Sequence, residues 1–135
     1  MKDQRQKFNY ADFDPVKAVA LTFPDTEEGI SHEGTPSVTV RGKLMCRLHD
    51  SGEFISIRIG FEERDKYLDS HPEIFHLPDH FKAYPYIAMW LHNYNKVLLT
   101  EILEISWKGR ATKKQLKDYE SKKAASLLEK LDIVD

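Results

Sequence analysis

Apolar and polar residues alternate along three consecutive runs between residues 34 and 59. Alternation with a period of two is typical of strands that bury one face and expose the other. Two short segments that contain glycine, Arg41-Gly42-Lys43 and Asp50-Ser51-Gly52-Glu53, separate the runs and suit tight connections. The pattern therefore predicts an antiparallel meander of three strands with one core face and one open face.

The lengths of the two loops decide which side chains share a face. A two-residue first loop would place Val38 on the same face as Lys43 and Arg47, whereas a three-residue loop, 41–43, places it with apolar neighbours. We therefore predict the three-residue loop, followed by a four-residue second loop, 50–53. The predicted core face holds Val38, Val40, Leu44, Cys46, Leu48, Ile55, Ile57 and Ile59. The predicted open face holds Thr39, Arg41, Met45, Arg47, Phe54, Ser56 and Arg58.

Apolar residues spaced by three and four predict helices on both sides of the meander. Asp14, followed by Pro15, starts a first helix that ends at about residue 23. The segment 61–70 is predicted to be a second helix, with Phe61 facing inward and Arg64 facing mostly outward.

The remaining segments are assigned in the same way. The acidic connection 25–33 has room for a short strand, and a second short strand is predicted within 74–77. Residues 86–91 alternate clearly and form a strand, whereas 95–108 and 112–131 have helical spacing. The prolines between 71 and 85 argue against regular helix in that stretch.

This order of elements predicts an α+β fold: a two-layer sandwich in which helices cover one face of an antiparallel sheet, in the order α-β(3)-α-β(2)-α. The chain has 135 residues, of which 41% are hydrophobic and 31% are charged, as in one globular domain. We predict a flexible lead-in over 1–13, a single domain over 14–116 and a basic helical tail over 117–135.

Other features bear on location and charge. The single cysteine, Cys46, allows no internal disulfide, and no apolar run approaches the roughly 20 residues that span a bilayer. These features, with the absence of a secretory signal in the first 14 residues, predict a cytoplasmic protein. The net charge is −2, but the segment 108–123 carries seven basic residues against two acidic ones and is expected to form a solvated basic arm.

Four short stretches occur together in a characteristic order. They are Phe23-Pro24-Asp25-Thr26-Glu27-Glu28, Gly34-Thr35-Pro36 leading into Val40-Arg41-Gly42-Lys43-Leu44-Met45, Tyr84-Pro85-Tyr86-Ile87, and Trp107 followed by Arg110-Ala111 and Lys113-Lys114-Gln115-Leu116. In these stretches the chain resembles the MmcQ/YjbR family over residues 14–116. The resemblance implies a YjbR-like α-β(3)-α-β(2)-α arrangement and a DNA-binding protein. Thr112 stands where the family often has proline, and the resemblance implies nothing about the tail beyond Leu116.

Catalytic and metal-binding patterns find little support in the sequence. His76 and His80 have the spacing of paired metal ligands on a helix, but Pro78 between them disfavours that helix, so hydrogen bonding within a loop is the preferred interpretation. Cys46 is expected to be buried and inert. No nucleophile elbow or phosphate-binding glycine loop is present. We therefore predict a non-enzymatic protein with no metal and no cofactor.

The open face supplies the candidate binding site. Arginines on strands beside exposed aromatic rings suit a nucleic-acid strand, with the cations on phosphates and the rings under bases. The candidate residues for binding DNA or RNA are Arg41, Lys43, Arg47, Arg58, Tyr86, Trp90, Lys108, Arg110, Lys113 and Lys114. Two alternatives remain: the aromatic residues close a small secondary core, or the face binds a protein partner or a second copy of the chain.

Overall fold

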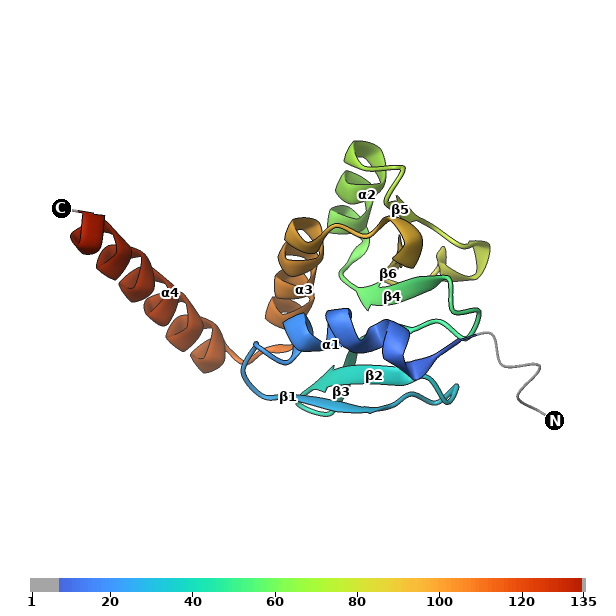
Figure 1. The fold of residues 1–135 in the computed structure, drawn as a ribbon, viewed down its shortest axis with the longest axis horizontal. Coiled ribbons are helices and arrows are strands. Elements are labelled where there is room, and N and C mark those ends of the chain that lie inside the picture. Colours follow the sequence, from blue (N-terminus) through green and yellow to red (C-terminus); the bar gives the residue numbers. More distant parts are fainter. Residues whose placement is uncertain (1–7, 135) are drawn as a thin grey trace.

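The computed structural model describes the backbone of residues 8–134 and the side chains of residues 8–131. Residues 1–7 of the predicted flexible lead-in lie outside the described residues, whereas Tyr10–Phe13 form a short 3-10 helix and Phe13 is fully buried in the core. The described chain forms an α+β fold with a six-stranded antiparallel sheet and four α-helices, as predicted at the level of fold class (Figure 1).

The sheet contains β1 (Thr26–Ile30), β2 (Pro36–Val40), β3 (Lys43–Leu48), β4 (Phe54–Arg58), β5 (Phe75–His76) and β6 (Tyr86–Trp90). Their spatial order is β1-β2-β3-β4-β6-β5, and every neighbouring pair is antiparallel. The helices are α1 (Asp14–Ala20), α2 (Phe61–Ser70), α3 (Lys96–Arg110) and α4 (Lys113–Val134). Four strands precede α2, because the acidic connection contains β1 at the sheet edge.

The main core lies between the sheet and the helices α1 and α3, which contact one another and cover one sheet face (Figure 1). Asn95 caps α3, because its side-chain Oδ1 accepts a hydrogen bond from the backbone N–H of Leu98 at 3.0 Å. Trp107, near the end of α3, is fully buried and donates from Nε1 to the carbonyl of Pro24 at 2.7 Å. These contacts fix the end of α3 over the sheet.

The predicted three-residue loop between β2 and β3 was wrong. The loop has two residues, Arg41 and Gly42, with φ of 52° and 80°, and a positive φ at both positions is typical of a type I′ turn. A bulge follows, because Val38 pairs with Cys46 whereas Thr39 pairs with Leu44, which leaves Met45 as the extra residue on β3.

The bulge explains how two residues in succession reach the core. Met45 and Cys46 are both fully buried, although the predicted register placed Met45 on the open face. Leu44, predicted to face the core, lines the open face instead. The four-residue second loop agrees with the prediction, since Leu48 pairs with Ile55 and Cys46 with Ile57.

The boundaries of α2 agree with the prediction, but the predicted directions of two side chains were wrong. Phe61 is 49% exposed, whereas Arg64 is only 6% exposed. Arg64 turns toward the connection between β5 and β6, where backbone carbonyls surround its guanidinium group. The aliphatic stem and the planar head of arginine allow such burial when its N–H groups find acceptors.

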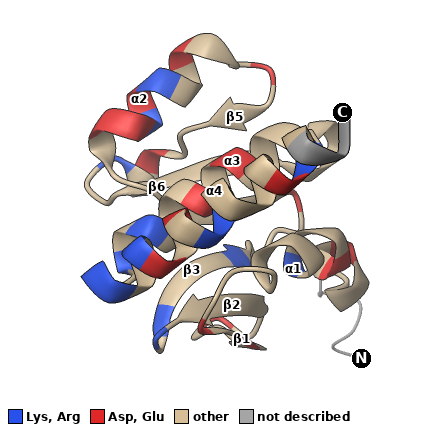
Figure 2. Cartoon of the chain, turned by 90° about the vertical axis from the view of Figure 1, so that its left-hand side faces the viewer, with Lys and Arg blue, Asp and Glu red and all other residues tan. Residues whose placement is uncertain are grey.

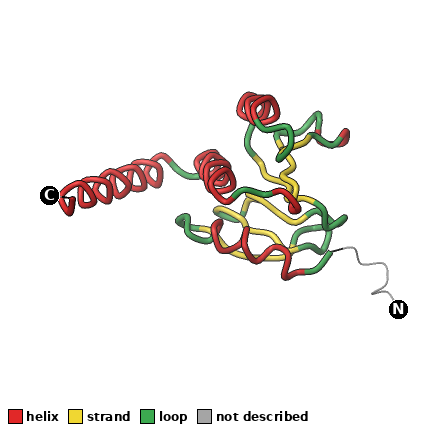
Figure 3. The backbone as a smooth tube through the Cα atoms, turned by 45° about the horizontal axis from the view of Figure 1, so that its top comes forward, coloured by secondary structure: helices red, strands yellow, loops and turns green. Residues whose placement is uncertain are grey.

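Helix α4 begins against the domain and then projects from it (Figures 1 and 3). Its first turns are tied to α3, because the Tyr119 hydroxyl donates to Glu104 at 2.6 Å and Lys123 pairs with the same carboxylate at 2.8 Å. Further along, Leu127 and Leu131 are exposed. In the described part of the chain, no helix combines the length and the apolar character needed to cross a membrane.

Candidate nucleic-acid interface

The structure divides the predicted binding residues into separate groups. Three of them, Arg41, Arg58 and Arg110, gather where the β2–β3 turn meets the end of α3. Figure 2 shows the basic segments of the turn and of the start of α4 on the same side of the molecule. We call these three arginines, together with Lys43 next to the turn and Lys113 at the start of α4, the basic cluster.

Three arginines of the basic cluster surround the last turn of α3. Arg41 donates from Nη1 to the carbonyl of Arg110 at 3.0 Å, and Arg110 donates from Nε to the carbonyl of Leu44 at 3.3 Å. The guanidinium of Arg58 lies beside Gly109, so close that a Cβ at this glycine would stand 3.1 Å from Nη1. The end of a helix attracts cations because its last carbonyls carry partial negative charge.

The basic cluster carries its charge without acidic partners. Within residues 8–131, no carboxylate oxygen lies within 4.0 Å of a basic nitrogen of these five side chains, whereas Lys108 pairs with Glu120 at 3.0 Å and Lys114 pairs with Asp118 at 3.1 Å. Burial lowers the pKa of Arg110, the charge of nearby Arg58 lowers it further, and Tyr86 opposes both effects. The guanidinium groups of Arg58 and Arg110 therefore repel one another.

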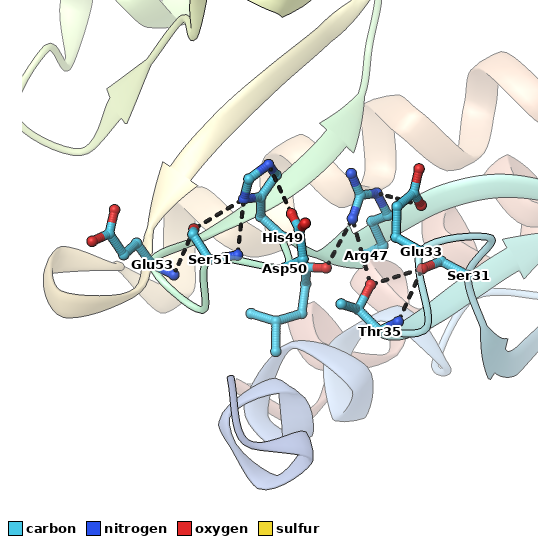
Figure 4. A network of polar contacts seen from close by, with 9 residues as sticks. Ser31, Glu33, Thr35, Arg47, His49, Asp50, Ser51 and Glu53 are labelled. Carbon is cyan, nitrogen blue, oxygen red and sulfur yellow. Dashed lines mark hydrogen bonds and ion pairs between the residues drawn. The ribbon is translucent and has the colours of Figure 1, made fainter. Parts of the chain in front are cut away.

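Arg47 lies apart from the basic cluster, near the loop between β1 and β2. Its side chain is 11% exposed, and its Nε lies 3.6 Å from a carboxylate oxygen of Glu33. It also donates to the carbonyl of Leu48 at 3.2 Å, and its Nη1 lies 3.5 Å from the hydroxyl of Thr35, at the limit of a hydrogen bond (Figure 4). This arginine is held in a polar network and is less available to a phosphate than the arginines around α3.

The two predicted aromatic residues belong to a small second core rather than to an exposed platform. Trp90 is half-buried and stacks on the ring of His76, with their centroids 3.6 Å apart. Tyr86 and Trp90 both pack against a buried cluster that includes Phe54 of β4 and Phe81. The connection between β5 and β6 supplies Phe81 and thereby covers part of the open face. Burial of the aromatic residues in a secondary core was one of the alternatives that the sequence left open.

Arg64 anchors this connection. Its Nη1 donates to the carbonyl of Tyr84 at 2.7 Å and to that of Phe81 at 3.2 Å, and its Nη2 lies 3.4 Å from the carbonyl of Lys82. The sequence did contain a signal for this role, because Arg64 lies four residues before Leu68, which packs against the main core, and such residues share one side of a helix. The charge of Arg64 hid its inward position.

A cavity of about 530 Å³ remains on the uncovered part of the open face. Its lining includes Phe81 and Tyr84 from the β5–β6 connection, and Ser56 from β4. The cavity reaches Leu44 and Tyr86, which contact Arg110 of the basic cluster. It therefore lies directly beside the basic cluster.

Cys46 is buried and His76 is half-buried, whereas His32 and His80 line the cavity. Burial raises the pKa of the Cys46 thiol to about 12, so this cysteine is protonated and inert at neutral pH. Burial lowers the pKa of His76 to about 4, and the nearby Glu53 opposes this shift. Among the described side chains, no group of three or more His, Cys, Asp or Glu residues is arranged to hold a metal ion.

Comparisons of the chain with protein-family models, with curated proteins and with solved structures find no match. The relationship to the MmcQ/YjbR family therefore stays a prediction based on short motifs. The basic cluster and the neighbouring cavity are the features of the described chain that bear on its function.

Proposed function

We propose that this protein binds nucleic acid without catalysing a reaction, and that the basic cluster contacts the phosphates. The observation that carries the proposal is the gathering of Arg41, Arg58 and Arg110 around the end of α3 with no carboxylate partner in residues 8–131. Guanidinium groups bind phosphate oxygens through parallel N–H donors and keep their charge at all physiological pH values. Such contacts position a nucleic acid without reading its sequence.

The partial charge of the helix does not neutralise this group. The C-terminal end of a helix carries roughly half a negative charge, whereas the basic cluster contains five positive side chains. The charges of Arg58 and Arg110 repel one another, and a bound phosphate lowers that repulsion. The strong acceptor oxygens of a nucleic-acid backbone therefore complement the cluster in both charge and geometry.

The family resemblance supports the same proposal from a separate source. The motif Val40-Arg41-Gly42-Lys43-Leu44-Met45 and the segment Arg110-Ala111 contain three of the five residues of the basic cluster. We accordingly propose a YjbR-like relationship, with β1 as an additional edge strand, and a cytoplasmic location. DNA-binding is the function that this resemblance implies, and fold analogy is only secondary support for it.

Fluorescence anisotropy with labelled DNA and RNA of about 20 nucleotides tests the proposal. We expect the wild type to bind at low salt and the triple variant Arg41→Ala/Arg58→Ala/Arg110→Ala to bind about a hundredfold more weakly, at about 1 kcal/mol for each lost contact. Equal affinities of the two proteins, or no binding by the wild type, would refute the proposal.

A matched control variant distinguishes binding at the basic cluster from attraction by the net charge of the protein. Lys17→Ala/Lys66→Ala/Lys82→Ala removes the same three charges, but each of these lysines already pairs with a carboxylate outside the basic cluster. We expect this variant to keep most of the wild-type affinity. A loss as large as that of the arginine variant would show attraction by net charge alone.

A second candidate function is self-association through α4. The projecting half of this helix exposes Leu127, Leu128 and Leu131 by 56%, 62% and 65%, which indicates an apolar surface available for a partner. Light scattering of the wild type and of Leu127→Lys/Leu131→Lys tests this candidate. A concentration-dependent dimer that the double substitution dissociates would support it, and a wild-type monomer at high concentration would exclude it.

A further inference from the structure

We infer that the cavity on the open sheet face receives one unpaired nucleobase while the basic cluster holds the adjacent phosphates. This inference rests on the proposed function and narrows it to single-stranded nucleic acid. It joins two features that are far apart in the sequence but share an edge in the structure.

The cavity lies next to the basic cluster. Gly42 lines the cavity and lies between Arg41 and Lys43 of the basic cluster. Leu44 also lines it, and the carbonyl of Leu44 accepts the hydrogen bond from Arg110. A strand whose phosphates contact the basic cluster therefore passes the mouth of the cavity.

Three aromatic residues, Phe81, Tyr84 and Tyr86, line the cavity. Phe81 and Tyr86 also pack in the second core, whereas Tyr84 keeps 59% of its surface exposed and offers the most accessible ring of this wall. Proteins that recognise single strands stack unpaired bases on such rings, because every base has a planar π-face. The hydrogen bonds from Arg64 hold the backbone of Tyr84 and Phe81, so this wall is fixed before a ligand arrives.

The rest of the lining combines apolar residues with hydroxyl groups that suit the edge of a base. Ser56 is 1% exposed, and its Oγ has no hydrogen-bond partner in the described part of the structure. Ser37 and Thr39 add further hydroxyl groups to the lining. Because a base presents donors and acceptors along one edge, hydroxyl groups that can serve as either match it well.

Charge decides the orientation of the ligand. Arg47 in the lining is already paired with Glu33, so it is less available to a phosphate than the arginines of the basic cluster. The basic cluster at the other side attracts phosphate, so the neutral base is the part of the strand that enters. The volume of about 530 Å³ lies within the range of small-ligand pockets, and a base in a duplex is paired and stacked and cannot enter.

The test compares binding of one labelled strand, alone and as a duplex, to the wild type and to Tyr84→Ala. We expect the wild type to prefer the single strand by about tenfold, and Tyr84→Ala to lose about tenfold in single-strand affinity while duplex affinity stays unchanged. Tyr94→Ala is the matched control, because Tyr94 is 39% exposed and does not line the cavity.

The possible results separate this inference from the proposed function. Equal binding of single strand and duplex, with no effect of Tyr84→Ala, would overturn the base-binding cavity and leave phosphate binding by the basic cluster intact. No binding of either form at low salt would overturn both. Thermal unfolding of each variant shows whether a loss of binding reflects a loss of structure.

Discussion

Arg64 lies buried in α2 with backbone carbonyls around its guanidinium group, whereas Arg41, Arg58 and Arg110 surround the last turn of α3 without any carboxylate partner in residues 8–131. Arg64 donates to carbonyls of one connection and thereby shapes the wall of a cavity. The three other arginines have few acceptors and lie beside one another. The same residue type, arginine, therefore stabilises the fold in one region and remains available to bind an anion in the other.

The comparison shows that the number of satisfied donors, rather than the number of charges, distinguishes the two roles. Arginine offers five N–H donors, and an acceptor for several of them makes burial tolerable. Where N–H donors lack acceptors and like charges are adjacent, binding of an external anion lowers the electrostatic repulsion between them. We therefore expect substitutions in the two regions to affect different properties.

The largest expected effect on stability is that of Arg64→Met. The substitution keeps an unbranched apolar stem but leaves the carbonyls of Phe81 and Tyr84 without their donor, which should lower the free energy of unfolding by about 3 kcal/mol. Urea unfolding monitored by tryptophan fluorescence measures the change. Arg58→Met is the matched control and should change stability by less than about 0.5 kcal/mol. Similar losses for both variants would contradict the division of roles.

A smaller effect is expected from an anion. Inorganic tripolyphosphate should stabilise the wild type by about 1.4 kcal/mol at ten times its dissociation constant, because it binds the folded basic cluster. The variant Arg41→Ala/Arg58→Ala/Arg110→Ala should show no such stabilisation. Thermal unfolding with and without tripolyphosphate measures this difference. An equal increase in the unfolding temperature of both proteins would show that tripolyphosphate binds outside the basic cluster.

A still smaller effect on stability is expected from the protonation of His76, which stacks on Trp90 in the covered part of the open face. In the unfolded chain the pKa of His76 is about 6.5. In the folded protein burial lowers the pKa of His76 to about 4. Stability should therefore fall as the pH decreases from 6.5 to 4, by about 1 kcal/mol once solvent screening of this half-buried ring is included. In His76→Leu this part of the pH dependence should disappear. An unchanged pH profile in the variant would contradict this explanation.

The fold class and most element boundaries could be predicted from apolar periodicity, but the register between β2 and β3 could not. Strand alternation assumes that each residue changes face, and the bulge at Met45 violates that assumption without any local mark in the sequence. The type I′ turn is equally hidden, because Arg41 stands at a position with positive φ that glycine or asparagine usually occupies.

The candidate site could be predicted only in part for a similar reason. Periodicity indicates which face of a strand a residue occupies, but it does not show where along the sheet the side chain meets other elements. Arg47 and Arg58 were grouped by face, yet Arg47 reaches Glu33 and Arg58 reaches Gly109. The contact between Arg41 and Arg110 joins residues 69 positions apart and depends on how α3 crosses the sheet.

The salt dependence of single-strand binding is the most direct measurement of whether the basic cluster binds phosphates. Each phosphate contact contributes about 0.7 to the slope of log affinity against log salt concentration on a single strand. We predict that the slope for Arg41→Ala/Arg58→Ala/Arg110→Ala is smaller than that of the wild type by about 2, and that the matched lysine variant keeps the wild-type slope. Identical slopes for the wild type and the arginine variant would contradict a phosphate-binding role for these three arginines.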